Sequence, residues 1–206
     1  AGKGTQVGQL AKDFNLLVFA TGEVFRTGVR QQSSLGKIAQ KYVERGELVP
    51  DDIVNGIVEE WIWKTTPSQG IIFDGFPRTT YQAAFLENTL VEMGRTFDAV
   101  VYLDVTDEQV VKRLSERLVC SVCMEEFHQK SAPFNTCPRQ KCNGEHLRHR
   151  DEDKPDVIGI LVKMFQRGIE PLLQHYEQSG RLFEINGDGP VGEVHDAIVA
   201  ALAPYR

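Results

Sequence analysis

Residues 71–78, with the sequence IIFDGFPR, join a short apolar run to a carboxylate, a glycine and an arginine. An apolar run of this kind is typical of a buried strand. The Asp-Gly that follows it would stand at the carboxyl end of the strand, where ligands bind in open α/β sheets. Asp74 could hold water molecules of a Mg²⁺ ion there, and Arg78 could contact a phosphate through two parallel hydrogen bonds. The alternative is a turn with a surface ion pair.

Apolar runs like this one alternate with amphipathic helical stretches along most of the chain. The runs stand at residues 16–19, 71–73, 100–103 and 182–185. Helical periodicity is clearest at residues 53–62, 110–118 and 157–164. Pro171 is expected to kink or end the last of these helices. Short strands that alternate with helices predict an α/β fold with a parallel sheet and right-handed crossovers.

Length and composition exclude several classes of protein. The 206 residues, 41% of them hydrophobic and 25% charged, are typical of one globular domain with a small insertion. A net charge of −6 argues against nucleic-acid binding through bulk charge. No apolar run approaches the roughly 20 residues that span a bilayer, and residues 1–10 lack the apolar core of a signal peptide. We therefore expect a cytoplasmic protein, with neither nucleic acid nor a membrane as a partner.

All four cysteines of the chain lie close together, at positions 120, 123, 137 and 142. The surrounding segment, residues 119–149, has little periodicity and too few apolar residues for a core of its own, so that a metal would supply the missing cohesion. Four thiolates around Zn²⁺ form a closed, structural site. We predict such a site at Cys120, Cys123, Cys137 and Cys142. The alternatives are four reduced thiols, two disulfides, or His128 in place of one cysteine ligand.

The chain begins with AGKGTQ, which matches the second half of a phosphate-binding loop. Its glycines allow backbone N–H groups to surround a phosphate, the following helix directs its positive end at the anion, and Lys3 reaches the outer phosphates. The strand and first glycines that precede such a loop are not in the sequence, so we expect about one strand and half a loop to be missing. The alternative is a flexible, glycine-rich tail.

Together these motifs resemble the adenylate kinase family of nucleoside monophosphate kinases, from residue 1 to about residue 202. AGKGTQ resembles the end of the family's phosphate loop, and ATGEVFR at residues 20–26 resembles its monophosphate-binding helix. GELVPDDIV at residues 46–54 resembles the segment that lines the monophosphate base. DGFPRTTYQA at residues 74–83 is the most specific motif. RHRDED at residues 148–153 resembles the residues after the lid, and the cysteines resemble the long form with a zinc-bearing lid.

The resemblance implies a three-layer P-loop kinase fold with a central parallel sheet. Its domains would be a core (residues 1–20, 65–118 and 154–206), a helical monophosphate-binding region (residues 21–64) and an inserted zinc lid (residues 119–153). It also implies a monomer that transfers a phosphoryl group reversibly from Mg-ATP to AMP and produces two ADP.

The resemblance further assigns roles to individual residues. Those implied to bind ATP are Ala1, Gly2, Lys3, Gly4, Thr5, Arg113 and Gly187. Those implied to bind AMP are Thr21, Arg26, Val49, Gly75, Arg78 and Gln82. Those implied to act in catalysis are Lys3, Arg78, Arg117 and Arg150.

Three positions depart from the family pattern. Leu161 stands where the family has a further arginine, Glu23 where aspartate is usual and Ala20 where serine is usual. Loss of an arginine near the transferred phosphoryl group can slow such a reaction by orders of magnitude. A catalytically weak relative that binds nucleotides as a sensor or scaffold is therefore one alternative. Another is a kinase that prefers a different nucleotide, with GTP as donor or another monophosphate as acceptor. A zinc-ribbon module that binds nucleic acid is disfavoured by the acidic charge.

Overall fold

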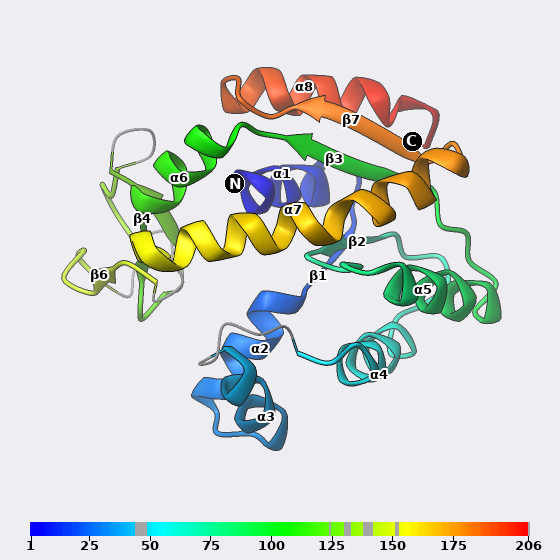
Figure 1. Ribbon diagram of the computed structural model, residues 1–206, viewed down its shortest axis with the longest axis horizontal. Helices are drawn as coiled ribbons and strands as arrows, with labels where there is room; N and C mark the ends of the chain where they lie inside the picture. Colours follow the sequence, from blue (N-terminus) through cyan, green and yellow to red (C-terminus); the bar gives the residue numbers. More distant parts are fainter. Residues whose placement is uncertain (44–48, 124, 130–132, 138–141, 151–152, 206) are drawn as a thin grey trace. The chain divides into compact units, whose positions relative to one another are not determined.

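The computed structural model describes residues 1–43, 49–123, 125–129, 133–137, 142–150 and 153–205 (Figure 1). The chain divides into two compact units, which we describe separately. The smaller comprises residue 1 and residues 105–164, and the larger comprises residues 2–104 and 165–206. Among the described residues, no helix combines the length and apolar character that crossing a bilayer requires.

The larger unit contains two pairs of parallel strands. In the first, β1 (Leu17–Ala20) lies beside β2 (Ile71–Asp74), with Leu17 opposite Ile71. In the second, β3 (Val100–Asp104) lies beside β7 (Leu182–Asn186), with Val100 opposite Leu182. These are the four strands expected from the apolar runs, each within one residue at either end. The predicted α/β class with parallel strands is confirmed.

Helices connect and cover these strands. In chain order they are α1 (Lys3–Asp13), α2 (Thr21–Arg30), α3 (Ser34–Val43), α4 (Asp51–Ile62), α5 (Thr80–Glu92), the second half of α7 (Pro155–Gln178), α8 (Val191–Ala201) and a final 3₁₀ turn, η2 (Ala203–Tyr205). Pro50 precedes α4, and two aspartates lie in its first turn, where negative charge interacts favourably with the helix dipole.

Two apolar cores hold the elements that carry the candidate site. In one, Val54, Val58 and Ile62 project from one face of α4 at four-residue spacing and pack with Phe19 of β1 and Leu86 of α5. In the other, Leu10 of α1 packs with Val194 and Ile198 of α8, and the strand residues Ile72, Val101, Leu103 and Ile185 pack against them. The second core anchors α1 behind its N-terminal end.

Of the two outcomes expected at Pro171, a kink or an end, the end is wrong, because α7 continues through this residue to Gln178. Proline removes one backbone hydrogen bond and crowds the preceding turn. Beyond this position, Leu172 and Tyr176 are buried against Ala83. This packing stabilises the last turns of α7. It is a tertiary contact, so the periodicity of the sequence could not predict it.

The smaller unit is built around the cysteines. After α6 (Asp107–Ser115), three short strands form an antiparallel sheet, with β4 (Arg117–Cys120) between β5 (Glu126–His128) and β6 (Leu147–Arg148). The expected helical periodicity up to residue 118 ends at Ser115 instead. The buried residues of this unit's core are the four cysteines and Phe127, with a few half-buried apolar neighbours.

Candidate active site and metal site

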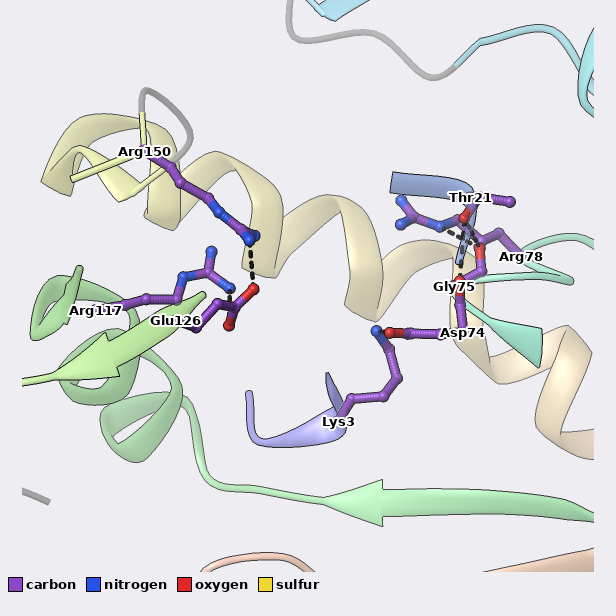
Figure 2. A network of polar contacts seen from close by, with 8 residues as sticks. All are labelled: Lys3, Thr21, Asp74, Gly75, Arg78, Arg117, Glu126 and Arg150. Carbon is purple, nitrogen blue, oxygen red and sulfur yellow. Dashed lines mark hydrogen bonds and ion pairs between the residues drawn. The ribbon is translucent and has the colours of Figure 1, made fainter. Parts of the chain in front are cut away.

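The phosphate-loop motif at residues 1–6 meets the motif that begins at Asp74 at the N-terminal end of α1. Gly2 precedes the helix with φ near +83°, a left-handed conformation that glycine adopts without strain. Lys3, on the first residue of the helix, forms an ion pair with Asp74 at the end of β2 (Figure 2). The lysine side chain is 57% exposed and that of Asp74 is 17% exposed. The ammonium group therefore remains accessible to an incoming anion.

Gly75 is the point at which Thr21 and Arg78 converge (Figure 2). The Thr21 hydroxyl donates to the carbonyl oxygens of Asp74 and Gly75, at 3.2 and 3.1 Å. Nε of Arg78 donates to the Gly75 carbonyl at 2.9 Å. Gly75 has φ near +80°, and a Cβ there would stand 2.9 Å from Thr21 Oγ1 and 3.3 Å from Arg78 Nη2. Only glycine suits both the backbone conformation and the space.

Gln82 belongs to a buried hydrogen-bond network behind Arg78. Its side-chain oxygen accepts from the backbone N–H of Arg78 at 2.7 Å, and its Nε2 donates to Asp51 at 2.7 Å. The other oxygen of Asp51 accepts from the hydroxyl of Thr79, which caps α5 by accepting from the Gln82 N–H. A side-chain amide has two N–H bonds and two lone pairs on its oxygen. These two contacts use one of each, so Gln82 has one N–H and one lone pair left for a ligand.

Sequence reasoning missed the role of Asp51 in this network. In the sequence, an acidic residue that follows Pro50 indicates a helix start and nothing more. Its position between α4 and α5 is a tertiary feature, since Asp51 and Gln82 lie 31 residues apart.

The other predicted residues of the larger unit take varied positions. Arg26 folds back over its own helix, so that a Cβ at Gly22 would stand 2.9 Å from Arg26 Nη1. Val49 is buried in the core with α4. The N–H of Gly187 donates to the Asp104 carbonyl at 2.7 Å and continues the pairing of β3 with β7. Gly4 and Thr5 are exposed in the first turn of α1.

The remaining predicted positions belong to the smaller unit or are not fully described. Ala1 is half-buried, and so is Arg113 near the end of α6. Residues 46–48 and 151–152 of the quoted motifs lie outside the described residues, as does the side chain of Leu161.

In the smaller unit, two predicted arginines share a network with two carboxylates. Arg117 donates through Nε and Nη2 to the two oxygens of Asp153, at 2.8 and 2.6 Å. Arg150 forms an ion pair with Glu126, whose other oxygen lies 3.8 Å from Arg117 Nη1 (Figure 2). The sequence analysis did not single out Glu126, and nothing in its local pattern distinguished it.

The four cysteines are buried, form no disulfide and belong to one small core. The sulfur atoms of Cys120, Cys123 and Cys142 lie within 4.8 Å of one another. The Cys120 thiol, 3.2 Å from that of Cys142, raises the pKa of Cys142 to about 12. Burial alone would raise the pKa of Cys120, but backbone N–H groups of Cys123 and Val122 bring it below its usual value. Burial raises the pKa of Cys123, and contact with Cys120 and Cys137 raises it further. Contact with Cys137 also adds to the raised pKa of Cys142, after Cys120 and burial.

The grouping of Cys120, Cys123 and Cys142 fits a zinc ion, whereas the fourth predicted ligand, Cys137, lies in the same core but is not one of the three sulfur atoms within 4.8 Å of one another. Several thiolates cannot share so small a volume without a cation, because each negative charge raises the pKa of the next. Soft sulfur donors in a closed, buried group suit Zn²⁺. Asp74, at the end of its strand and next to Lys3, likewise offers the hard oxygen ligand that Mg²⁺ prefers.

Comparison with known proteins agrees with this geometry. The family model for adenylate kinase matches residues 1–181. Adenylate kinase of Listeria monocytogenes serotype 4a (strain HCC23) is 35% identical over 194 residues, which are 94% of this chain and 90% of that protein. The adenylate kinases of Methanothrix thermoacetophila and Archaeoglobus fulgidus are each 37% identical over 100% of this chain and 95% of their own length. The chain therefore belongs to the adenylate kinase family.

Proposed function

We propose that this protein catalyses the reversible transfer of a phosphoryl group from Mg-ATP to AMP and produces two ADP. Phosphoryl transfer requires positioning and charge neutralisation more than covalent help from the protein. The observation that carries the proposal is the convergence of Lys3, Asp74, Thr21 and Arg78 around Gly75, within one compact unit of a family member.

On the acceptor side, Arg78 and Arg26 bind the α-phosphate of AMP. The Gly75 carbonyl accepts from Nε of Arg78 and so orients the guanidinium group, which is the planar donor that suits phosphate oxygens. Thr21, the backbone at Val49 and Gln82 surround the adenine. The unused N–H and lone pair of Gln82 match the donor and acceptor that an adenine edge presents.

On the donor side, Lys3 and the backbone of residues 1–5 bind the phosphates of ATP. Positive charge at the start of α1 supports this role, since the first N–H groups of a helix have no partner within it. Arg113 lies against the donor adenine, Gly187 approaches the same base, and Arg117 and Arg150 act on the transferring group. Asp74 would hold, through water molecules, the Mg²⁺ ion that accompanies ATP, and such an ion would neutralise part of the phosphate charge.

The proposal includes the expected division into a core, a monophosphate-binding region at residues 21–64 and a lid at residues 119–153. Zn²⁺ on Cys120, Cys123, Cys137 and Cys142 makes the lid rigid, and lid closure excludes water from the γ-phosphate. A cytoplasmic location is supported by the four cysteines, which form no disulfide, as is typical of a reducing compartment. We expect a monomer, which light scattering would test.

Turnover with different nucleotide pairs tests the function directly. ATP with AMP should give ADP faster than any other pair, at roughly 1–100 s⁻¹. Faster turnover of UMP or CMP than of AMP would overturn the acceptor assignment. Preference for GTP over ATP would overturn the donor assignment.

Leu161 favours a second candidate, a weak enzyme that binds nucleotides as a sensor or scaffold. If the missing arginine limits catalysis, Leu161→Arg should raise kcat by at least about tenfold, since arginines that stabilise such transition states contribute 10³-fold or more. Full-length, zinc-loaded protein with turnover below about 1 s⁻¹ would support this candidate. Turnover above that value, with no gain from the substitution, would exclude it.

A further inference from the structure

The arginines assigned to the donor phosphates already face an anion, the carboxylate of Glu126. Arg117 stands opposite His128 in the pairing of β4 with β5, and Glu126 is two residues from His128 on the same strand. Alternate residues share one face of a sheet, so Glu126 is a diagonal neighbour of Arg117 on that face. Its Oε1 pairs with Arg150 and its Oε2 lies 3.8 Å from Arg117 (Figure 2).

The two carboxylates of this network have different environments. The Asp153 side chain is only 1% exposed, and both of its oxygens accept from Arg117 in a bidentate pair. This geometry fixes the plane of the guanidinium group. The Glu126 side chain is 40% exposed and has no hydrogen bond to Arg117, whose nearest nitrogen is 3.8 Å away. Asp153 is therefore a fixed partner, whereas Glu126 is itself partly exposed and can turn to water when another anion takes its place on Arg150, whose side chain is only 13% exposed.

Glu126 places negative charge against both guanidinium groups before any ligand arrives, since it pairs with Arg150 and lies 3.8 Å from Arg117. A triphosphate that approaches these arginines gains less attraction while Glu126 remains in place. If Glu126 moves away, its negative charge leaves the arginines, and the Arg150 nitrogen that it held can turn to phosphate oxygens.

We propose that Glu126 is an internal counter-anion that the phosphates of ATP displace from Arg150 and Arg117, so that this carboxylate lowers the affinity of the lid for the donor nucleotide. The proposal rests on the phosphate-binding roles given above to the two arginines. A phosphate group succeeds in the exchange because it has more charge and more acceptor oxygens than a single carboxylate. When product leaves, Glu126 pairs with the arginines again and keeps them from holding ADP.

Glu126→Gln tests this exchange, because it removes the charge and preserves the size of the side chain. Binding of tripolyphosphate, measured by calorimetry on the whole zinc-loaded protein, should tighten by roughly three- to tenfold, as expected for one unit charge near the site. KM for ATP should fall by a similar factor, while KM for AMP stays within about twofold. Glu126→Ser removes the same charge with a shorter side chain and should also tighten tripolyphosphate binding.

Glu108→Gln is the matched control. Glu108 is exposed on α6 in the same unit, and the substitution changes the net charge of the protein equally. It should leave tripolyphosphate binding within about twofold of the unmodified protein. Equal tightening in the Glu108 and Glu126 variants would overturn the proposal, because the effect would be one of overall charge. Weaker binding in the Glu126 variants would also overturn it, since Glu126 would then orient the arginines and not compete with phosphate.

Arg150→Lys and Arg150→Ala separate this proposal from the one on which it rests. If they weaken tripolyphosphate binding and the Glu126 variants leave it unchanged, the arginine is a phosphate ligand and the counter-anion role is wrong. If neither set changes binding, both the counter-anion and the assigned role of Arg150 are wrong.

Discussion

Replacing Gly75 with alanine adds one methyl group at the point where Thr21 and Arg78 meet. Two separate penalties follow from the structure. The backbone there has φ near +80°, which costs an L-residue about 1–2 kcal/mol. The new Cβ would also stand 2.9 Å from Thr21 Oγ1 and 3.3 Å from Arg78 Nη2, so that one of the two side chains must move.

The two penalties have different consequences. The backbone term should lower the melting temperature by roughly 2–8 °C, because 1 kcal/mol corresponds to about 2–4 °C for a chain of this size. The steric term should reduce kcat/KM for AMP by about 10- to 100-fold, because small displacements of positioning groups cost rate on this scale. KM for ATP should stay within about twofold, since the atoms nearest to the added methyl group belong to Thr21 and Arg78 and not to the residues assigned to ATP.

Gly94→Ala provides the matched control. Gly94 also has a positive φ, near +68°, but no atom of the described residues beyond its chain neighbours lies within 4 Å of its expected Cβ. The control should lose similar stability and keep its kinetic constants. A coupled assay for ADP and a thermal melt on both variants give the comparison. If the two variants have the same KM and kcat for AMP, the positioning role of Gly75 is refuted. If the Gly94→Ala variant has the same melting temperature as the unmodified protein, the penalty for a positive φ is smaller than expected.

Three further predictions concern the other parts of the structure. Arg78→Ala should raise KM for AMP by about 10- to 100-fold, since a charge-assisted hydrogen bond contributes about 1.5–3 kcal/mol; an equal loss of ATP affinity would contradict its assignment to the acceptor. Removing zinc with a chelator should lower the melting temperature, because metal-binding energy is folding energy where few apolar residues form the core; elemental analysis without metal and an unchanged melt would exclude the zinc site. Tyr176→Phe should leave stability unchanged or raise it by up to about 1 kcal/mol, because the buried Tyr176 hydroxyl has no hydrogen-bond partner among the described residues; a loss above about 1 kcal/mol in urea unfolding would show a partner beyond them.

The sequence by itself determined the parallel strands and the motifs at their ends. Each strand is an apolar run ended by a polar or small residue, and burial on both faces demands such a run whatever its partner. The motif at residues 74–83 and the glycines of residues 1–6 could be recognised because phosphate binding restricts residue type and spacing together. The same reasoning predicted the cysteine cluster, since metal ligands need both soft donors and proximity.

Only the tertiary structure decided which of these residues touch. Lys3 was expected near phosphate and Asp74 near Mg²⁺, yet their ion pair joins positions 71 residues apart in the chain. Asp51 follows a proline, a pattern that indicates only a helix start, and its bond to Gln82 depends on how α4 packs beside α5. The three short strands of the smaller unit have almost no periodicity, because they surround cysteines and not an apolar core. Glu126 had no signal at all, since a carboxylate becomes a counter-anion only when folding brings two arginines to it.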